Sequence, residues 1–382
     1  MKLIKIFFLT CILLPFSFIL VGCWNYRELE DMNIVVGAAI DKGIYKEYMI
    51  TLEILEPSIG EETPTTSRLI SSEGDSIFDA VRNAISISGQ KLYWSHNKVL
   101  ILSKEIAQKG VIGILDWFHR DAETRSDVYI LISKENSAKE ILEKKEKEGQ
   151  VTSFNLLDIL VNQKNLAKAP DVQIWKLTDD IINDGIMAIA PTIELTISDD
   201  NLCPKVAGTA IFKNDKLVGF LDENETHYLL FLRDKIKGGI LDLNPEGKNE
   251  PPTITLEIFD SKTKIQPVTK GNEIEMNVNI NTLGSIAAIK NTKNYLANEE
   301  ILEKVTSSSI KENCEKLISR VQSEYGTDIF GFGAKTRIRY PTLWKEIGGN
   351  WENIFQNLKV NITVKAEIKN SAMTTKPLEI GD

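Results

Sequence analysis

The chain has 382 residues, a formal net charge of −9, 42% hydrophobic residues and 26% charged residues. This composition is typical of a globular protein rather than a disordered one, and the length suits two or three domains. The acidic excess argues against a nucleic-acid ligand, because phosphate binding needs clustered Lys and Arg. It also argues against a body that lies flat on anionic lipid.

The first 23 residues have the pattern of a lipoprotein leader. Lys2 and Lys5 form a positive n-region, and an apolar stretch follows at Ile6–Gly22. The stretch ends at Leu20–Cys23, which has the pattern of a bacterial lipobox, in which the cysteine thiol receives a diacylglyceryl group. The alternative is an uncleaved transmembrane helix, which this length barely permits. Pro15 in the middle of the run and the lipobox at its end disfavour that alternative.

Two acyl chains on Cys23 would hold the protein at a membrane surface. Each buried methylene contributes about 0.8 kcal/mol, and a second chain turns a marginal attachment into a stable one. No later stretch approaches the roughly 18 apolar residues that span a bilayer. We therefore expect a soluble body outside the cytoplasm, tethered to one leaflet. Its net charge is about −11 once Lys2 and Lys5 are removed with the leader.

The chain contains four cysteines. Cys11 leaves with the leader and Cys23 is acylated, so only Cys203 and Cys314 remain. They lack C-x-x-C spacing, so the sequence supports neither a metal site nor a disulfide framework. One Cys203–Cys314 bridge is possible in an oxidising compartment, but two separate thiols are favoured.

Strands and helices alternate in the first part of the mature chain. Ile34–Ile40 and Tyr48–Leu55 predict a hairpin, and Pro57–Thr66 predicts a loop. Ser76 and Asp79 have the spacing of a weak capping box, so a helix is expected to begin there. The next predicted elements, in order, are a buried strand (Lys98–Leu102), a short helix that Ser103 can cap and that stops at Gly110, a mostly buried helix (Val111–Phe118), a second strand (Asp127–Ile132) and a polar helix (Ser137–Lys147). This alternation indicates a mixed α/β unit.

Antiparallel strands dominate after a boundary near residues 199–201. Ala207–Phe212 and Leu217–Leu221 predict a hairpin, because the intervening Asn214-Asp215 suits the positive-φ positions of its turn. Asp222 and Glu225 mark a helix start. The region from Gly238 to Ala288 predicts an antiparallel meander rather than a parallel sheet, with strands at Thr253–Phe259, Lys264–Val268 and Glu273–Ile280.

The longest predicted helix runs from about Asn298 to Tyr325 and ends at Gly326. Its buried stripe follows the i, i+4, i+7, i+11 rhythm at Ile310, Cys314, Leu317 and Val321. An alternating strand, Val360–Ile368, comes later. The sequence thus predicts an α+β fold, a multidomain mixed α/β ectodomain with antiparallel sheets and a long C-terminal helix. Its predicted parts are a signal peptide (1–22), an N-terminal mixed α/β domain (23–200), a small β-rich middle domain (201–270) and a C-terminal α+β domain (271–382).

Motifs for catalysis are lacking in the sequence. His96, His119 and His227 do not form a zinc-ligand pattern, and no G-x-S-x-G motif occurs. Gly326–Gly331 has the glycine spacing of a P-loop, but Phe332 occupies the lysine position, so a backbone turn after the long helix explains the glycines better. We therefore expect no catalytic residues, no metal ion and no cofactor, and the protein is predicted not to be an enzyme.

Polar and aromatic residues are densest in Tyr93–His96 and Trp117–Arg125. Ser95, His96 and Asp121 could form a nucleophile–base–orienter set. A contact surface is the better interpretation, because Trp, Tyr and Arg dominate interface energies. In the alternative without any binding role, His96 caps the following strand, and the charged residues Arg120, Asp121, Glu123 and Arg125 form ion pairs. The candidate interaction surface consists of Trp94, His96, Trp117, Arg120 and Asp121.

Several segments, in this order, carry a family resemblance: the lipobox with Trp24–Leu29, then Ala39–Asp41, Ser88–Lys98, Asp116–Asp121, Gly208–Lys213 with Leu217–Gly219, and Gly326–Gly333. Together they resemble the Ger(x)C family of spore germination lipoproteins, the C subunits of nutrient germinant receptors. The resemblance covers nearly the whole chain.

This resemblance implies a three-domain mixed α/β ectodomain on the outer face of the spore's inner membrane. It implies two partners, a membrane-embedded A subunit and a transporter-like B subunit, in a complex whose nutrient binding triggers release of ions and dipicolinate. Cys23 is the one residue to which the resemblance assigns a defined role, the attachment of lipid. The competing interpretation is a substrate-binding lipoprotein of an ABC-type importer, which needs two lobes with parallel βαβ sheets around a cleft.

Overall fold

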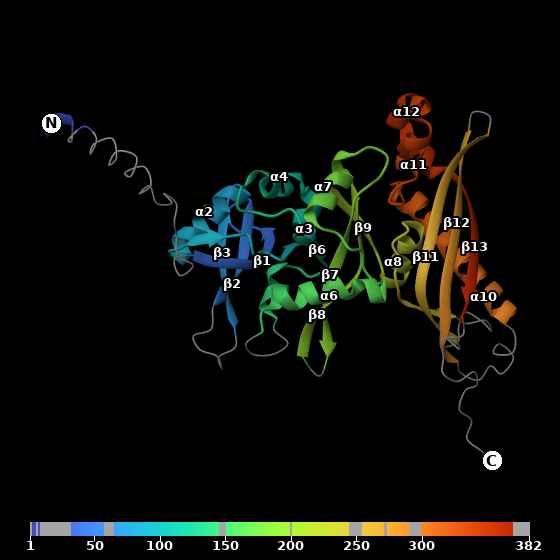
Figure 1. The fold of residues 1–382 in the computed structure, drawn as a ribbon, viewed down its shortest axis with the longest axis horizontal. Coiled ribbons are helices and arrows are strands. Elements are labelled where there is room, and N and C mark those ends of the chain that lie inside the picture. Colours follow the sequence, from blue (N-terminus) through green and yellow to red (C-terminus); the bar gives the residue numbers. More distant parts are fainter. Residues whose placement is uncertain are drawn as a thin grey trace, which may run out of the picture.

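The computed structural model describes residues 2–4, 7, 32–56, 65–144, 150–198, 201–243, 254–270, 273–289 and 299–369. Cys23, the rest of the lipobox and Trp24–Leu29 lie outside these residues, so lipidation stays a prediction. The described elements form two sheets that follow one another along the long axis of the molecule (Figure 1). None of the helices in the described ranges is long and apolar enough to cross a membrane.

The N-terminal half contains a mixed sheet in the order β3-β2-β1-β5-β6-β7-β8-β9, with β4 paired to β1 outside this path. Its strands are β1 (Met32–Lys42), β2 (Tyr48–Glu56), β3 (Thr66–Gly74), β4 (Lys91–Tyr93), β5 (Val99–Leu102), β6 (Tyr129–Ser133), β7 (Ile189–Ser198), β8 (Asn201–Lys213) and β9 (Lys216–Leu221). The central strands β1, β5, β6 and β7 are parallel. All four residues of β5 are buried, as expected for a strand covered on both faces.

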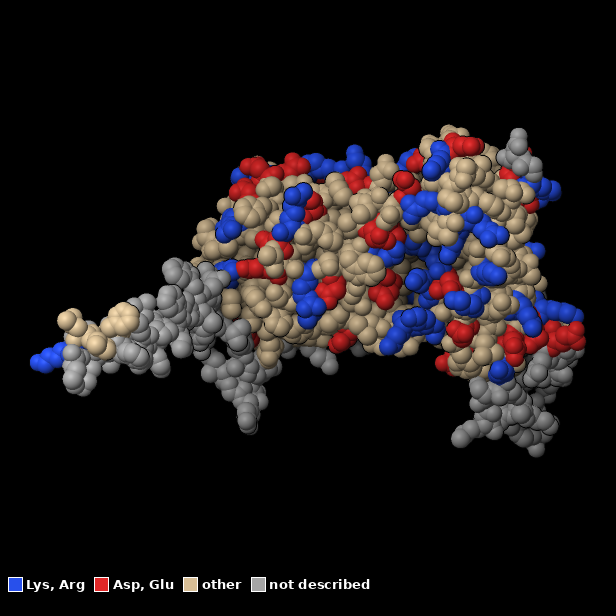
Figure 2. Space-filling view, turned by 45° about the horizontal axis from the view of Figure 1, so that its top comes forward, with Lys and Arg blue, Asp and Glu red and all other residues tan. Residues whose placement is uncertain are grey.

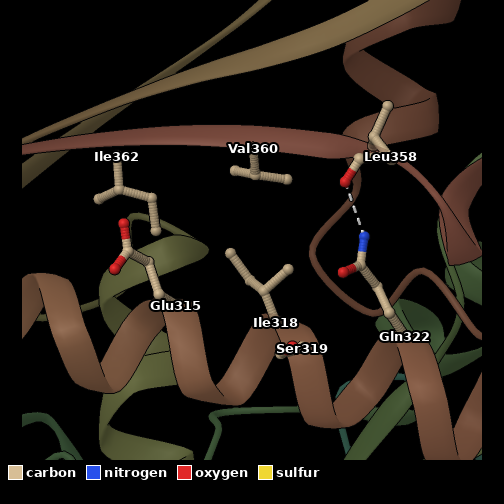
Figure 3. A pocket seen from close by; sticks show the side chains of 7 residues that line it. All are labelled: Glu315, Ile318, Ser319, Gln322, Leu358, Val360 and Ile362. Carbon is tan, nitrogen blue, oxygen red and sulfur yellow. Dashed lines mark hydrogen bonds between the residues drawn. The ribbon is translucent and has the colours of Figure 1, made fainter.

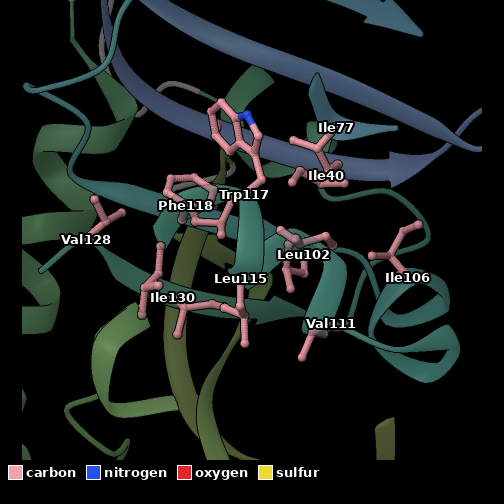
Figure 4. Close-up of a cluster of buried hydrophobic side chains, with 14 of the residues drawn as sticks. Ile40, Ile77, Leu102, Ile106, Val111, Leu115, Trp117, Phe118, Val128 and Ile130 are labelled. Atoms are coloured by element: carbon pink, nitrogen blue, oxygen red, sulfur yellow. The ribbon is translucent and has the colours of Figure 1, made fainter. Parts of the chain in front are cut away.

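Helices cover both faces of this sheet. One core lies under α2 (Ile77–Ser88), α3 (Lys104–Lys109), α4 (Ile112–Arg120) and α7 (Ile174–Ile182), and the other lies under α5 (Lys139–Glu143) and α6 (Thr152–Leu166). Figure 4 shows part of the first core, in which Trp117 and Phe118 of α4 belong to the same cluster as the sheet residues Ile40 and Leu102. The predicted caps are confirmed, because the hydroxyls of Ser76 and Ser103 accept backbone N–H groups at the starts of α2 and α3.

The C-terminal half contains a sheet in the order β10-β11-β12-β13. Its strands are β10 (Ile240–Leu243), β11 (Ile254–Lys270), β12 (Glu273–Ile289) and β13 (Lys359–Ile368), and its helices are α8 (Glu223–Leu232), α10 (Glu299–Arg320), α11 (Phe332–Arg339), α12 (Pro341–Ile347) and α13 (Trp351–Gln356). A π-helical turn, Val321–Tyr325, extends α10, and a 3-10 turn, Gly348–Asn350, follows α12. The pairs β10–β11 and β11–β12 are antiparallel, whereas β13 is parallel to β12. Two of the three strand pairs are therefore antiparallel, which differs from the parallel βαβ sheet in each lobe of an importer binding protein.

The predicted α+β class with antiparallel sheets and a long C-terminal helix is confirmed. Ile310, Cys314, Leu317 and Val321 are buried in one stripe, and the helix ends at Gly326 with φ 59°. Asp222 and Glu225 form a complete capping box. Two predictions are wrong. The strands predicted at Thr253–Phe259 and Lys264–Val268 are parts of the single strand β11, which a bulge between Ile258 and Asp260 bends without breaking. Thr253 itself lies outside the described residues. In the described part of the polar helix predicted at Ser137–Lys147, only α5 is helical, and Lys145–Lys147 lie outside the described residues.

The boundaries predicted at residues 200 and 270 fall between paired strands. β7 and β8 are antiparallel neighbours, and so are β11 and β12. The two sheets also share a core, because Ile211 and Leu221 of the N-terminal sheet pack in the same apolar cluster as Leu256 of β11. The division into three domains stays a prediction about folding units.

Candidate functional site

Trp94 and Trp117 lie in the N-terminal core, with 3% and 8% of their surfaces exposed. Their rings meet edge to face with centroids 4.9 Å apart, and the ring of Phe118 packs edge to face against both. Such aromatic contacts stabilise a core beyond the area they bury. Both rings are therefore buried, whereas the sequence predicts an exposed surface at these two positions. The reason is the helical period, which turns Trp117 of α4 toward the sheet.

The three polar members of the predicted surface lie outside this core. His96 and Arg120 are exposed, and Asp121 is half-buried. Arg120 Nε donates to both carboxylate oxygens of Asp116, at 2.8 and 2.7 Å, one turn earlier on α4. Asp121 Oδ1 accepts the backbone N–H of Glu123 at 2.9 Å. Partner contact at His96, Arg120 and Asp121 stays a prediction.

The geometry disfavours the nucleophile–base–orienter set. The Ser95 hydroxyl donates to the backbone carbonyl oxygen of Glu123 at 3.2 Å, so its proton is directed away from His96. The Glu123 carboxylate pairs with Lys91, and Arg125 pairs with Asp127 at 2.6 Å. These contacts agree with the interpretation of the charged residues as ion pairs.

Asp328, in the predicted turn after the long helix, is a fully enclosed carboxylate. Its Oδ1 accepts the backbone N–H groups of Phe330, Gly331 and Phe332 at 3.1, 2.9 and 3.2 Å. Its Oδ2 accepts the N–H of Gly333 at 2.7 Å and the indole Nε1–H of Trp351 at 2.9 Å. Burial raises the pKa of Asp328, and the donors oppose that shift. The carboxylate thus supplies acceptors at the start of α11, which has no side-chain cap of its own.

The Asp328 loop joins the two halves of the protein. Met187, just before β7, donates its N–H to the Asp328 carbonyl oxygen at 2.8 Å, and Ala334 donates to the Gly185 carbonyl oxygen at 2.6 Å. Gly185 has φ 87°, and a Cβ there would lie 2.7 Å from Ala334 N. A Cβ on Gly333 would lie 2.6 Å from Trp351 Nε1. Two glycines are therefore required for the close approach of the backbones, a role that spacing alone could not reveal.

A buried ion pair provides a second link between the halves. Asp180 of α7 accepts from Arg233, at the end of α8, at 3.3 Å, and their side chains are 3% and 10% exposed. Lys176 completes the group at 2.7 Å from Asp180. Removing one partner of such a buried pair is costly, because it leaves an uncompensated charge.

His227 of α8 is the one buried histidine of the three. Its Nδ1 lies 3.3 Å from the Ala167 carbonyl oxygen, at the end of α6. Burial lowers the pKa of His227 to about 4, and the charge of Lys168 acts in the same direction. The ring is therefore neutral at physiological pH.

Neither remaining cysteine is bonded, which confirms the prediction of two separate thiols. Cys314 lies in the core under α10, where burial raises the pKa of its thiol and makes it inert.

The described residues include no group of three or more His, Cys, Asp or Glu side chains that could hold a metal ion. Two hollows open on the C-terminal half: one of about 180 Å³ between α10 and β13, and one of about 320 Å³ on the sheet face near Asn281. On the face visible in Figure 2, acidic and basic side chains are interspersed over the N-terminal half, and Lys and Arg are more numerous over the C-terminal half.

Comparisons with known proteins match both halves of the chain. Residues 25–195 match the model of the spore germination protein N-terminal domain, and residues 207–372 match the model described as spore germination B3/GerAC like, C-terminal. Among proteins of Bacillus subtilis (strain 168), spore germination protein YndF is 26% identical, covering 91% of this chain and 92% of its own. Spore germination protein B3 is 26% identical, covering 92% and 94%.

The crystal structure of the GerBC protein has a similar fold. The TM-score is 0.56 at 24% sequence identity, and the match covers 87% of this chain and 97% of that one. The two sheets and the buried contacts between them make this chain a two-part α+β protein with a fold similar to that of the GerBC protein. The chain belongs to the spore germination GerAC family.

Proposed function

We propose that this chain is the lipid-anchored subunit of a nutrient germinant receptor and that it works by contact with membrane-embedded subunits rather than by catalysis. The observation that carries the proposal is the order of its parts. A lipobox ending at Cys23 stands directly before the first family-matched segment, residues 25–195, and the second follows at 207–372. Family membership supports the role in germination, and the leader supports the anchor.

The anchor places the folded body at the outer face of the cell membrane, which in the spore is the inner membrane. β1 begins at Met32, so the tether from Cys23 reaches at most about 30 Å. A body confined within that distance meets membrane proteins at a far higher effective concentration than a free one. The A and B subunits that the family resemblance implies are the proposed partners, and no cofactor is required.

Substitution of Cys23 tests the anchor. Cys23→Ala removes the thiol that receives the lipid, so the protein should leave the membrane fraction of spores and germination in nutrients should slow. Cys203→Ala is the matched control, since it removes a free thiol elsewhere in the chain. Immunoblots of membrane and soluble fractions, with germination followed by loss of optical density, provide the measurement. Full membrane retention and normal germination of Cys23→Ala would refute the proposal.

A further inference from the structure

β13 is an edge strand, with β12 on one side and no other described strand on the other. Near its C-terminal end, the N–H groups of Ala366 and Ile368 point away from β12. They donate to Ser307 Oγ and Glu303 Oε1 of α10, at 3.0 and 3.1 Å. Side chains of α10 thus cover this part of the edge.

Along the other part of the edge, the described residues supply no such cover. The backbone N–H and C=O groups of successive residues point to opposite sides of a strand. Those of Val360, Ile362 and Val364 therefore point away from β12, as those of Ala366 do. Within the described part of the chain, no backbone hydrogen bond joins these three residues to a neighbour on that side. Residues 360–364 therefore offer unpaired donors and acceptors, which are a template for another strand.

A groove of about 180 Å³ lies beside this stretch, lined by the apolar residues Ile318, Leu358, Val360 and Ile362 and by the polar residues Glu315, Ser319 and Gln322. Figure 3 shows Ile318 of α10 pointing toward Val360 and Ile362 of β13, with the Glu315 carboxylate at one end of the groove. At the other end, Gln322 Nε2 donates to the carbonyl oxygen of Leu358 at 2.9 Å. The volume suffices for one large side chain, because an apolar cavity of about 150 Å³ accommodates benzene.

We propose that an extended segment of a membrane-embedded receptor subunit pairs with β13 at residues 360–364 and inserts one large apolar side chain into the groove, an inference that rests on the proposed function. Main-chain hydrogen bonds supply affinity in this mode of recognition, and the groove supplies specificity. Glu315 is half-exposed at the rim, and its nearest cation, Lys311, is 3.9 Å away. A Lys or Arg beside the inserted side chain complements this carboxylate.

A short peptide fits this edge better than a second copy of the chain. The open stretch covers residues 360–364, about half of β13, and Ser307 and Glu303 occupy the remainder. Two copies could pair only through these five residues, whereas a short extended peptide needs no longer edge.

Ser319 provides a variant that fills the groove. It is exposed and lines the groove, so the indole of Ser319→Trp would occupy the space meant for the inserted side chain. Ser308→Trp is the matched control, because Ser308 is an exposed serine of the same helix that does not line the groove.

The experiment co-expresses the full chain with the A and B subunits and purifies it through a tag on this chain. Recovery of the two subunits is measured, and hydrogen exchange of residues 358–366 is compared between the complex and the chain alone. Wild type and Ser308→Trp should recover both subunits and slow exchange at Val360, Ile362 and Val364 about tenfold or more. Ser319→Trp should reduce recovery about tenfold, as loss of a central anchor does.

Other outcomes are possible, and each contradicts either the assignment of the groove or the proposed function. Unslowed exchange at 358–366 in the wild-type complex, or full recovery with Ser319→Trp, overturns the assignment of the groove while leaving the proposed function in place. Exchange that slows with rising concentration of the chain alone overturns it in favour of a second copy. A wild-type chain that recovers neither subunit contradicts the proposed function itself. The exchange readout on wild type holds even where Ser319→Trp fails to fold.

Discussion

Three buried carboxylates accept hydrogen bonds at helix N-termini, and two of these helices lie far from their carboxylate in the sequence. Asp41 of β1 accepts the N–H groups of Ala138 and Lys139, at 2.7 and 3.0 Å, at the start of α5. Glu53 of β2 accepts those of Thr152 and Ser153, at 2.9 and 2.8 Å, at the start of α6. Asp328 does the same for α11. None of these three helices has a side-chain cap of its own, so the carboxyl oxygens supply the acceptors that the first turns lack.

Substitution of Asp328 should destabilise the joint between the halves. In Asp328→Asn, the amide NH₂ would face the donors of Gly333 and Trp351, which now share one carboxylate oxygen. Two donors would lose their acceptor, and the free energy of unfolding should fall by roughly 3 kcal/mol. Urea denaturation measures the change. The control is the exposed Asp260→Asn, which should change stability by less than about 0.5 kcal/mol; equal stability of both variants would contradict the structural role.

His227 should make stability depend on pH. Burial lowers its pKa from 6.5 to about 4, so between these values the unfolded chain binds a proton that the folded chain does not. The free energy of unfolding therefore falls as the pH drops through this window, by about 2 to 3 kcal/mol. His227→Gln should remove this part of the pH dependence, and the exposed His96→Gln should retain it. Urea denaturation at pH 7 and pH 4.5 measures the difference, and identical slopes for wild type and His227→Gln would count against the buried neutral ring.

At the scale of elements, local signals decided which helices and strands the sequence could predict. α2, α3 and α8 begin at Ser76, Ser103 and Asp222, whose own side chains cap them, and all three were predicted. The sequence does not predict α6 and predicts α5 too long, because the carboxylates at their starts, Glu53 and Asp41, lie on distant strands. It does not predict α11 because the glycines beside the local acceptor Asp328 are interpreted as a turn alone. β11 was split in two because its bulge interrupts the alternation from which strands are predicted.

The joint between the halves should be sensitive to a single methyl group. Gly185→Ala places a Cβ 2.7 Å from the backbone at Ala334 and forces a non-glycine residue to φ 87°. We expect a loss of about 2 to 4 kcal/mol in the free energy of unfolding. Gly113→Ala is the control, because nothing lies within 4 Å of the added methyl in α4. It should stabilise the protein by up to about 1 kcal/mol. Thermal unfolding of both variants tests this, and a neutral Gly185→Ala would show that the joint is loose.

At the scale of the whole molecule, the protein is a body of two sheets joined by a shared core, the Asp328 loop and the Asp180–Arg233 ion pair. Residue types alone suggested Trp94 and Trp117 as a contact surface, but which side of a helix or loop faces the sheet depends on the packing of distant strands. The groove was equally hidden from sequence reasoning, because α10 and β13 build it from residues about 40 positions apart. The lipobox, by contrast, is a local motif that a sequence displays directly.

Mass spectrometry of the N-terminus of the membrane-extracted protein tests most directly the claim that a lipid on Cys23 anchors this subunit. The predicted result is a chain that begins at Cys23 and carries a diacylglyceryl group on its thiol, with residues 1–22 absent. A chain that retains the leader, with an unmodified thiol at position 23, would contradict the account.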